Sequence, residues 1–181
     1  MNMHRSTPGW MKRACAVMAF GALVSPDSLA CYAPPRGQVV TPQEQIAMAT
    51  DVSVARVVRA TPSTAQKGGG RQAVEYEFEV VQRILGPNDA GFVLAGAQGE
   101  TRTALPAGDH GDEAFWQHGG GRLYNDTDCV LRPNFVVGES YLIFRDKPAT
   151  RRSFEHIETV RGRPNPDDKW LSYVVKKLGS R

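Results

Sequence analysis

Residues 74–80, VEYEFEV, alternate strictly between apolar and acidic side chains. Successive side chains of a β-strand point to opposite faces of a sheet, so this period of two predicts a strand with one buried face and one hydrated face. The alternation breaks at Val80-Val81, where one extra residue would form a β-bulge and bend the strand. A bent strand of this kind is typical of curled antiparallel sheets and small barrels.

Four other segments have strand character, because they are short, rich in β-branched or aromatic residues and bounded by turn residues. We expect these strands in residues 52–58, 92–96, 141–144 and 153–160. Residues 61–70, which contain Pro62 and three consecutive glycines, are expected to form a turn. Five strands in this arrangement predict a mainly β fold, a small five-stranded antiparallel barrel.

Two helices are expected beside this barrel. Thr41-Pro42-Gln43-Glu44 has the pattern of a capping box with proline at the first helical position, which predicts a short N-terminal helix extending to Met48. A C-terminal helix is expected to open at residues 164–168, with its acidic residues in the first turn. Its apolar stripe consists of Trp170, Val174 and Leu178, with Leu171 and Val175 beside it. This stripe predicts that the helix packs on the sheet.

The first thirty residues have the three parts of a secretory signal peptide. Lys12 and Arg13 precede an apolar run, and small residues stand three and one before an expected cut after Ala30. The run is roughly eleven residues, about half of what a membrane-spanning helix needs, so we expect no transmembrane segment. The sequence therefore predicts residues 1–30 as a signal peptide and residues 31–181 as a single domain, secreted or periplasmic.

The charge of the chain is nearly balanced. The whole sequence has 22 Lys+Arg and 19 Asp+Glu, a net charge of +3. Cleavage after Ala30 would remove Arg5, Lys12, Arg13 and Asp27, which leaves 19 basic and 18 acidic residues and a net charge of +1. Because a nearly neutral domain has little attraction for polyanions, we expect a protein partner and no nucleic acid.

Cleavage would also remove Cys15 and leave two cysteines, Cys31 and Cys129. Two thiols in an oxidising compartment are expected to form one disulfide, which would join the new N-terminus to the body of the domain. Lipidation of Cys31, which would anchor the protein to the cell envelope, is the alternative. We favour the disulfide, because Ser28 stands where a lipoprotein signal usually has leucine.

Residues 100–128 show neither helical nor strand periodicity and are expected to form a long loop. His110, Asp112 and His118 have side chains that ligate zinc and similar ions. One hypothesis is therefore a metal-binding or metal-dependent hydrolytic envelope protein that uses residues 108–118. The alternative is a polar loop anchored by Phe115 and Trp116, which either pack into the barrel or bind a partner as exposed aromatic side chains.

The order of these features resembles the netrin/TIMP-like family, the OB-fold module of the tissue inhibitors of metalloproteinases and of netrin and complement C-terminal regions. The resemblance extends from Cys31 to Phe144. It rests on Cys31 as first residue of the mature chain, a helix opening at Pro42-Gln43, the segments ATDVSV and YEFEV, and Cys129 ahead of FVVGESYLIF. This resemblance implies an OB-fold for the domain.

In those inhibitors the amino group and carbonyl of the first cysteine chelate the zinc of a protease, and the next residue enters the specificity pocket. The resemblance therefore assigns these roles to Cys31 and Tyr32. An α-amine and a carbonyl oxygen suit the open coordination position of a catalytic zinc. Ala33 stands where the inhibitors have a second cysteine.

The sequence has no Gly-x-Ser-x-Gly motif, no phosphate-binding loop and no cysteine pair with redox spacing. We therefore expect a non-enzymatic, exported binding module without a cofactor. Its expected partner is a protein, and a zinc metalloprotease is the specific partner that the resemblance implies.

Overall fold

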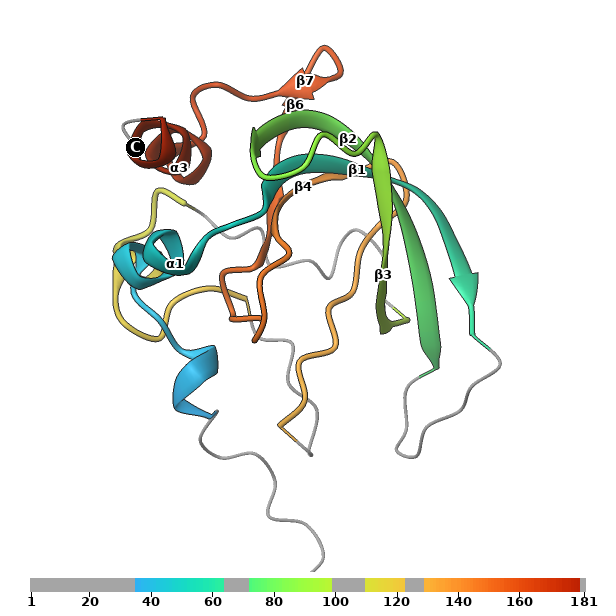
Figure 1. Cartoon of the computed structure of the whole chain (residues 1–181), viewed down its shortest axis with the longest axis horizontal. Helices are drawn as coiled ribbons and strands as arrows, with labels where there is room; N and C mark the ends of the chain where they lie inside the picture. The colour runs from blue at the N-terminus through green and yellow to red at the C-terminus, as the bar shows by residue number, and fades with distance from the viewer. Residues whose placement is uncertain (1–34, 64–71, 99–109, 123–128, 180–181) are drawn as a thin grey trace, which may run out of the picture.

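The computed structural model describes residues 35–63, 72–98, 110–122 and 129–179. In these residues the fold is mainly β, a curled five-stranded antiparallel sheet accompanied by three α-helices (Figure 1). The expected signal peptide, Cys31 and Tyr32 lie outside the described residues.

The sheet has the strand order β3-β2-β1-β4-β5, and every neighbouring pair is antiparallel. The strands are β1 (Val52–Pro62), β2 (Ala73–Leu85), β3 (Gly91–Ala97), β4 (Ser140–Phe144) and β5 (Phe154–Ile157). The five expected strands are therefore present. β1 and β2 are longer than expected, because they pair from Val52 with Leu85 as far as Pro62 with Val74. β1 thus includes the beginning of the expected turn.

The last expected strand, residues 153–160, is divided in the structure. β5 pairs with β4, whereas β6 (Thr159–Val160) pairs with β7 (Arg163–Pro164) in a separate two-stranded hairpin. The backbone at Glu158 bonds outside the sheet, its carbonyl accepting from Asn165 N at 2.8 Å. β-branched residues lie on both sides of this break, so strand propensity alone did not reveal it.

Three register shifts bend the pairing of β1 with β2. Val54 and Ala55 are adjacent, but their partners are Gln82 and Val80, so Val81 is an extra residue. The bulge predicted at Val80-Val81 is therefore confirmed. The other two shifts leave Ile84 on β2 and Val58 on β1 as extra residues. Because bulges bend a strand and increase its twist, these three explain how the two long strands curl (Figure 1).

The alternation of β2 sets its two faces as predicted. Its buried side chains are Val74, Tyr76 and Phe78. On the opposite face Glu79 pairs with Arg56 at 2.6 Å, and Glu77 pairs with Arg59. Both ion pairs are exposed, and pairs of this kind add little to stability. The buried face therefore contributes most of the stability of this strand.

β4 is buried along its whole length and separates two apolar clusters. Leu142 and Phe144 face the first cluster, which includes residues from all three helices. Tyr141 and Ile143 face the second cluster, which includes Phe135 and the buried face of β2. The curled sheet therefore has a core on each face of β4.

The helix α1 (Pro42–Met48) begins with the predicted capping box. Thr41 Oγ1 accepts from Glu44 N at 3.2 Å, and Glu44 Oε2 accepts from Thr41 N at 2.6 Å. These reciprocal bonds satisfy two backbone donors at the start of the helix. Pro42, Gln45 and Ile46 are the buried residues that fix α1 to the domain.

The helix α3 (Lys169–Leu178) is capped by the preceding residue, Asp168, whose side chain accepts from Leu171 N at 2.8 Å. The expected acidic residues therefore lie ahead of the helix and not in its first turn. It packs on the sheet as predicted, through the buried residues Trp170, Leu171, Val174 and Leu178. Val175, expected beside the stripe, is instead 39% exposed. None of the helices in the described ranges is long and apolar enough to cross a membrane.

The expected structureless segment 100–128 contains a short helix, α2 (Glu113–Trp116). Asp112 caps it, its Oδ1 accepting from Ala114 N at 3.0 Å. A single helical turn is too short to show a periodic pattern, which is why the sequence did not predict it.

Candidate functional site

His110 lies between two carboxylates in the interior of the domain. Its ring is 5% exposed. Nδ1 is 2.7 Å from Asp168 Oδ2 at the start of α3, and Nε2 is 3.7 Å from Glu155 Oε2 on β5. The imidazole thus connects the segment before α2 with both the sheet and the C-terminal helix.

The two carboxylates keep the ring protonated at neutral pH. Burial by itself lowers the pKa of His110, but the hydrogen bond with Asp168 and the negative charges of Asp168 and Glu155 outweigh burial. The pKa of His110 is consequently raised from 6.5 to about 9. His110 is therefore an imidazolium that holds two acids together.

Arg152 places a second buried cation beside these groups. Its Nε donates to Val40 O at 2.8 Å and its Nη2 donates to Gln117 O at 2.7 Å, while the guanidinium lies 4.7 Å from the centre of the Phe115 ring. Burial lowers the pKa of Arg152, and the negative charge of Glu155 opposes that effect. Arg152 thereby links the backbone just before α1, at Val40, to the backbone just after α2, at Gln117.

Glu155 is fully buried, and its Oε1 accepts from Arg122 N at 3.0 Å. We call His110, Arg152, Glu155 and Asp168 the His110 cluster. Two acids and two cations balance in charge, which makes their burial tolerable. Every member is bonded to the backbone or to another member, so the His110 cluster joins residues 110–122 to β5 and α3.

A pH dependence of stability follows from this geometry. The pKa of His110 is about 9 in the folded protein and near 6.5 in an unfolded chain. The contribution of the imidazolium is therefore complete below pH 6.5 and is lost as the pH rises through about 9. We expect it to be about 3 kcal/mol. Urea unfolding of the native protein and of His110→Gln, at about pH 6 and about pH 10, measures it. An equal loss of stability in both proteins would contradict the assignment.

The three residues proposed from the sequence as metal ligands have separate roles. His110 is in the His110 cluster, Asp112 caps α2, and His118 is exposed on the surface with Nδ1 3.9 Å from Glu44 Oε2 of α1. No group of three or more His, Cys, Asp or Glu side chains in the described ranges is arranged to hold a metal ion. The structure therefore does not bring the expected ligand set together.

Phe115 and Trp116 turn inward. Phe115 is buried, and its ring centre lies 4.6 Å from that of His110 and 5.4 Å from that of Trp170. Trp116 is partly buried, and its Nε1 donates to His110 O at 2.9 Å. The cap at Asp112 starts α2 in the orientation that directs both rings to the core. The pair therefore packs into the core beside the curled sheet, as one of the two expectations had it, whereas an exposed aromatic anchor at Phe115 does not match the structure.

Gln38, seven residues after Cys31, lies beside Cys129. Gln38 Nε2 donates to Cys129 O at 2.8 Å, and Gln38 O accepts from Arg151 N at 3.0 Å. Cys129 itself has a left-handed backbone with φ 60°. Seven residues span at most about 25 Å when extended, so the chain between Gln38 and Cys31 is long enough for a disulfide between Cys31 and Cys129. The pairing of the two cysteines stays a prediction, since Cys31 lies outside the described residues.

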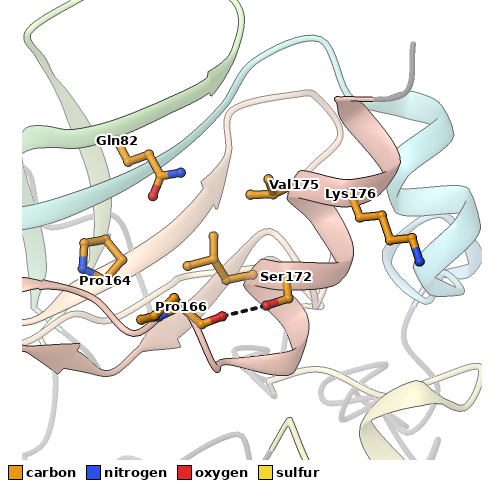
Figure 2. Close-up of a pocket in the computed structure, with 7 residues that line it drawn as sticks. Gln82, Pro164, Pro166, Ser172, Val175 and Lys176 are labelled. Carbon is orange, nitrogen blue, oxygen red and sulfur yellow. Dashed lines mark hydrogen bonds between the residues drawn. The ribbon is translucent and has the colours of Figure 1, made fainter.

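An open groove of about 360 Å³ lies between α3 and β2 (Figure 2). Pro164, Pro166, Leu171 and Val175 give it an apolar lining, and Gln82 adds an amide from β2. Ser172 Oγ donates to Pro166 O at 2.8 Å, and the side chain of Lys176 leads away from the other labelled residues in Figure 2. Apolar contact is therefore the main interaction that this groove offers.

Glu155, Asp168 and Arg152 were not among the residues proposed from the sequence. Asp168 was expected only as an acid in the first turn of a helix, and Glu155 lies in a strand whose buried face was ambiguous. No protein-family model matches the chain, and no curated protein is similar to it in sequence.

Proposed function

We propose that this protein is an exported, non-enzymatic binding module of the netrin/TIMP-like OB-fold type. It recognises a partner protein through its N-terminal end, where Cys31 is disulfide-bonded to Cys129 and Tyr32 is exposed to the partner. The observation that supports the proposal is the contact of Gln38 with Cys129, which places a residue seven positions after Cys31 beside the second cysteine. A disulfide between the two cysteines would preorganise the N-terminal end, which favours binding.

The topology of the sheet supports the OB-fold part of this proposal. β1 lies at the centre of the strand order β3-β2-β1-β4-β5 and pairs with both β2 and β4. Bulges in β1 and β2 curl the sheet. Both features suit a five-stranded barrel that is open between β3 and β5.

The His110 cluster favours binding over catalysis as the function of this domain. Its four ionisable groups are bonded within the fold, and His110, Arg152 and Glu155 are buried. A catalytic acid or base must reach the substrate proton directly or through one water. These side chains instead hold the segment 110–122 against β5 and α3.

Metalloprotease inhibition is the specific activity that follows from a free amine at Cys31. Insertion of one alanine before Cys31 turns the amine of Cys31 into an amide and moves the free amine to the alanine. The extended protein should therefore no longer inhibit a zinc protease that the native protein inhibits. Inhibition constants of the two proteins against that protease measure the effect, and we expect at least a hundredfold loss, on the order of 3 kcal/mol.

A control variant with the insertion after Gly179, at the opposite end of the chain, should inhibit as the native protein does. Equal inhibition by the version extended before Cys31 would overturn the chelation mechanism. Identification of the N-terminal residue by mass spectrometry establishes that each protein begins at the intended residue.

A further inference from the structure

β3 forms one end of the sheet and leaves part of its backbone without a neighbouring strand. Its residues are Gly91-Phe92-Val93-Leu94-Ala95-Gly96-Ala97, and it pairs only with β2 in the sheet. In Figure 1 it lies at the border of the curled sheet, next to β2. An unpaired strand edge is a row of hydrogen-bond donors and acceptors that suits another strand.

The hydrogen bonds around β3 define which residues face outward. Val80 N donates to Ala90 O, and Gln98 N donates to Gln72 O. Since antiparallel pairing alternates, the even-numbered residues of β3 bond to β2 and the odd-numbered residues face away from it. Ala97 N, facing away, donates to Pro133 O at 3.0 Å. The other odd-numbered residues of β3 are Gly91, Val93 and Ala95. Their outward N–H and C=O groups have no partner in the described part of the chain.

This edge lacks the usual features that protect a strand from pairing with another chain. Such features are charged side chains, proline and β-bulges. β3 contains no charged residue and no proline, and its register with β2 is continuous over all seven residues. Val93, at its centre, is 57% exposed. Among the residues that the structure describes, this edge is therefore free of bulges, uncharged and exposed at Val93.

We propose that β3 pairs antiparallel with β3 of a second copy of this chain, with the two-fold axis at Val93. In this register Val93 lies opposite Val93 of the partner, and Gly91 lies opposite Ala95. All three outward residues then exchange N–H···O bonds with the partner, as hydrogen-bonded antiparallel pairs do. The two sheets become one continuous sheet across the dimer.

The side chains of β3 fit this register as well as its backbone does. Phe92 lies opposite Leu94 of the partner, and both side chains are only partly buried in the single chain. Apolar cross-strand pairs of this kind stabilise a sheet. A register centred on Phe92 or on Leu94 brings only two of the three outward residues opposite one another. The identical strand is the occupant that this edge fits best, because two uncharged copies do not repel each other.

The size of the contact sets the strength of the association. Stable protein interfaces bury about 1,200 Å² or more, whereas this contact is centred on one strand of seven residues, so we expect a weak association. The dimer is therefore in equilibrium with the monomer and grows with concentration.

Disulfide trapping tests the register directly. Hydrogen-bonded antiparallel partners have Cα atoms about 5.5 Å apart, within disulfide range, so Val93→Cys should form a covalent dimer linked 93 to 93 under mild oxidation. In the same register two copies of residue 95 lie about 13 Å apart along the strand, so Ala95→Cys should not form the dimer. Peptide mapping identifies the linked residues. Equal cross-linking of both variants, or of neither, would overturn the proposal.

The mass of the native protein in solution tests the association itself. Sedimentation equilibrium at protein concentrations up to about 1 mM, where a dimer with a Kd of about 1 mM is half-formed, should show a rising fraction of molecules with the mass of two chains. Val93→Lys should stay at the mass of one chain. Val137→Lys, at a valine that is 54% exposed outside the sheet, should behave as the native protein does. A native protein that keeps the mass of one chain throughout contradicts the dimer, and so does a dimer that Val93→Lys leaves intact.

Discussion

Replacing His110 with alanine is expected to lower the free energy of unfolding by about 3–5 kcal/mol, the range typical for breaking a buried ion pair from one side. The substitution leaves Asp168 and the fully buried Glu155 without the imidazolium that lies 2.7 Å and 3.7 Å from their carboxylates. Asp168 loses its charged partner, and the fully buried Glu155 loses one of the two cations beside it, which is the reason for the large effect. Part of the loss also comes from the cavity beside the Phe115 ring.

Urea unfolding followed by far-ultraviolet circular dichroism measures this change. The matched control is His118→Ala, because the side chain of His118 is 63% exposed and its neighbour Glu44 is 3.9 Å away. A surface substitution of this kind is expected to change stability by less than about 0.5 kcal/mol. Similar losses in the two variants would show that His110 does not hold the carboxylates in place.

Replacing Trp170 with alanine is expected to cost about 3–5 kcal/mol, as for other buried tryptophans. Trp170 is fully buried at the centre of the cluster that joins α3 to the sheet. Its ring centre lies 5.4 Å from that of Phe115, 5.8 Å from that of Trp116 and 6.1 Å from that of Phe144. The substitution removes contacts with α2, β4 and α3 together.

The control for this second variant is Val175→Ala on the same helix. Val175 is 39% exposed, so it loses little buried area, and alanine has the higher helix propensity. We expect a change of less than about 1 kcal/mol for this control in the same urea titration. A Trp170→Ala variant as stable as Val175→Ala would mean that α3 contributes little to the fold.

Much of the fold follows from local patterns in the sequence. The alternation in residues 74–80 predicted both faces of β2, and its interruption predicted the bulge at Val81. The capping box at Thr41 and Glu44 predicted the start of α1. Each of these patterns concerns residues that are close in sequence, and each follows from backbone geometry alone.

The His110 cluster was not predictable in the same way. His110 and Asp168 are separated by 58 residues, and the contact depends on how α3 crosses the sheet. Glu155 lies between Phe154 and His156 in a short strand, where a glutamate normally indicates a hydrated position. Glu155 is buried because His110 and the backbone of Arg122 lie against it, and Ile157 of the same strand packs in the cluster that contains α2 and α3. No local pattern contains that information.

The histidines of the segment 108–118 illustrate the same limit of local patterns. The gathering of imidazoles and carboxylates within a few residues suggested a shared ligand role for His110 and His118, but the helical turn between them sends one side chain inward and the other to the surface. A ligand set needs convergent side chains, which sequence spacing predicts only within one helix or one strand.

The carboxylate of Asp168 makes two contacts, which link the folding of α3 to that of the segment 110–122. One oxygen caps α3 and the other binds His110. His110 and the start of α3 are thus held by one side chain, although His110 and Asp168 are 58 residues apart in the sequence. The curled hairpin of β1 and β2 joins strands that are neighbours in the sequence, so it can form early. The contact of residues 110–122 with α3 needs both segments in place, so the docking of α3 and the ordering of the segment that contains α2 are coupled steps of folding.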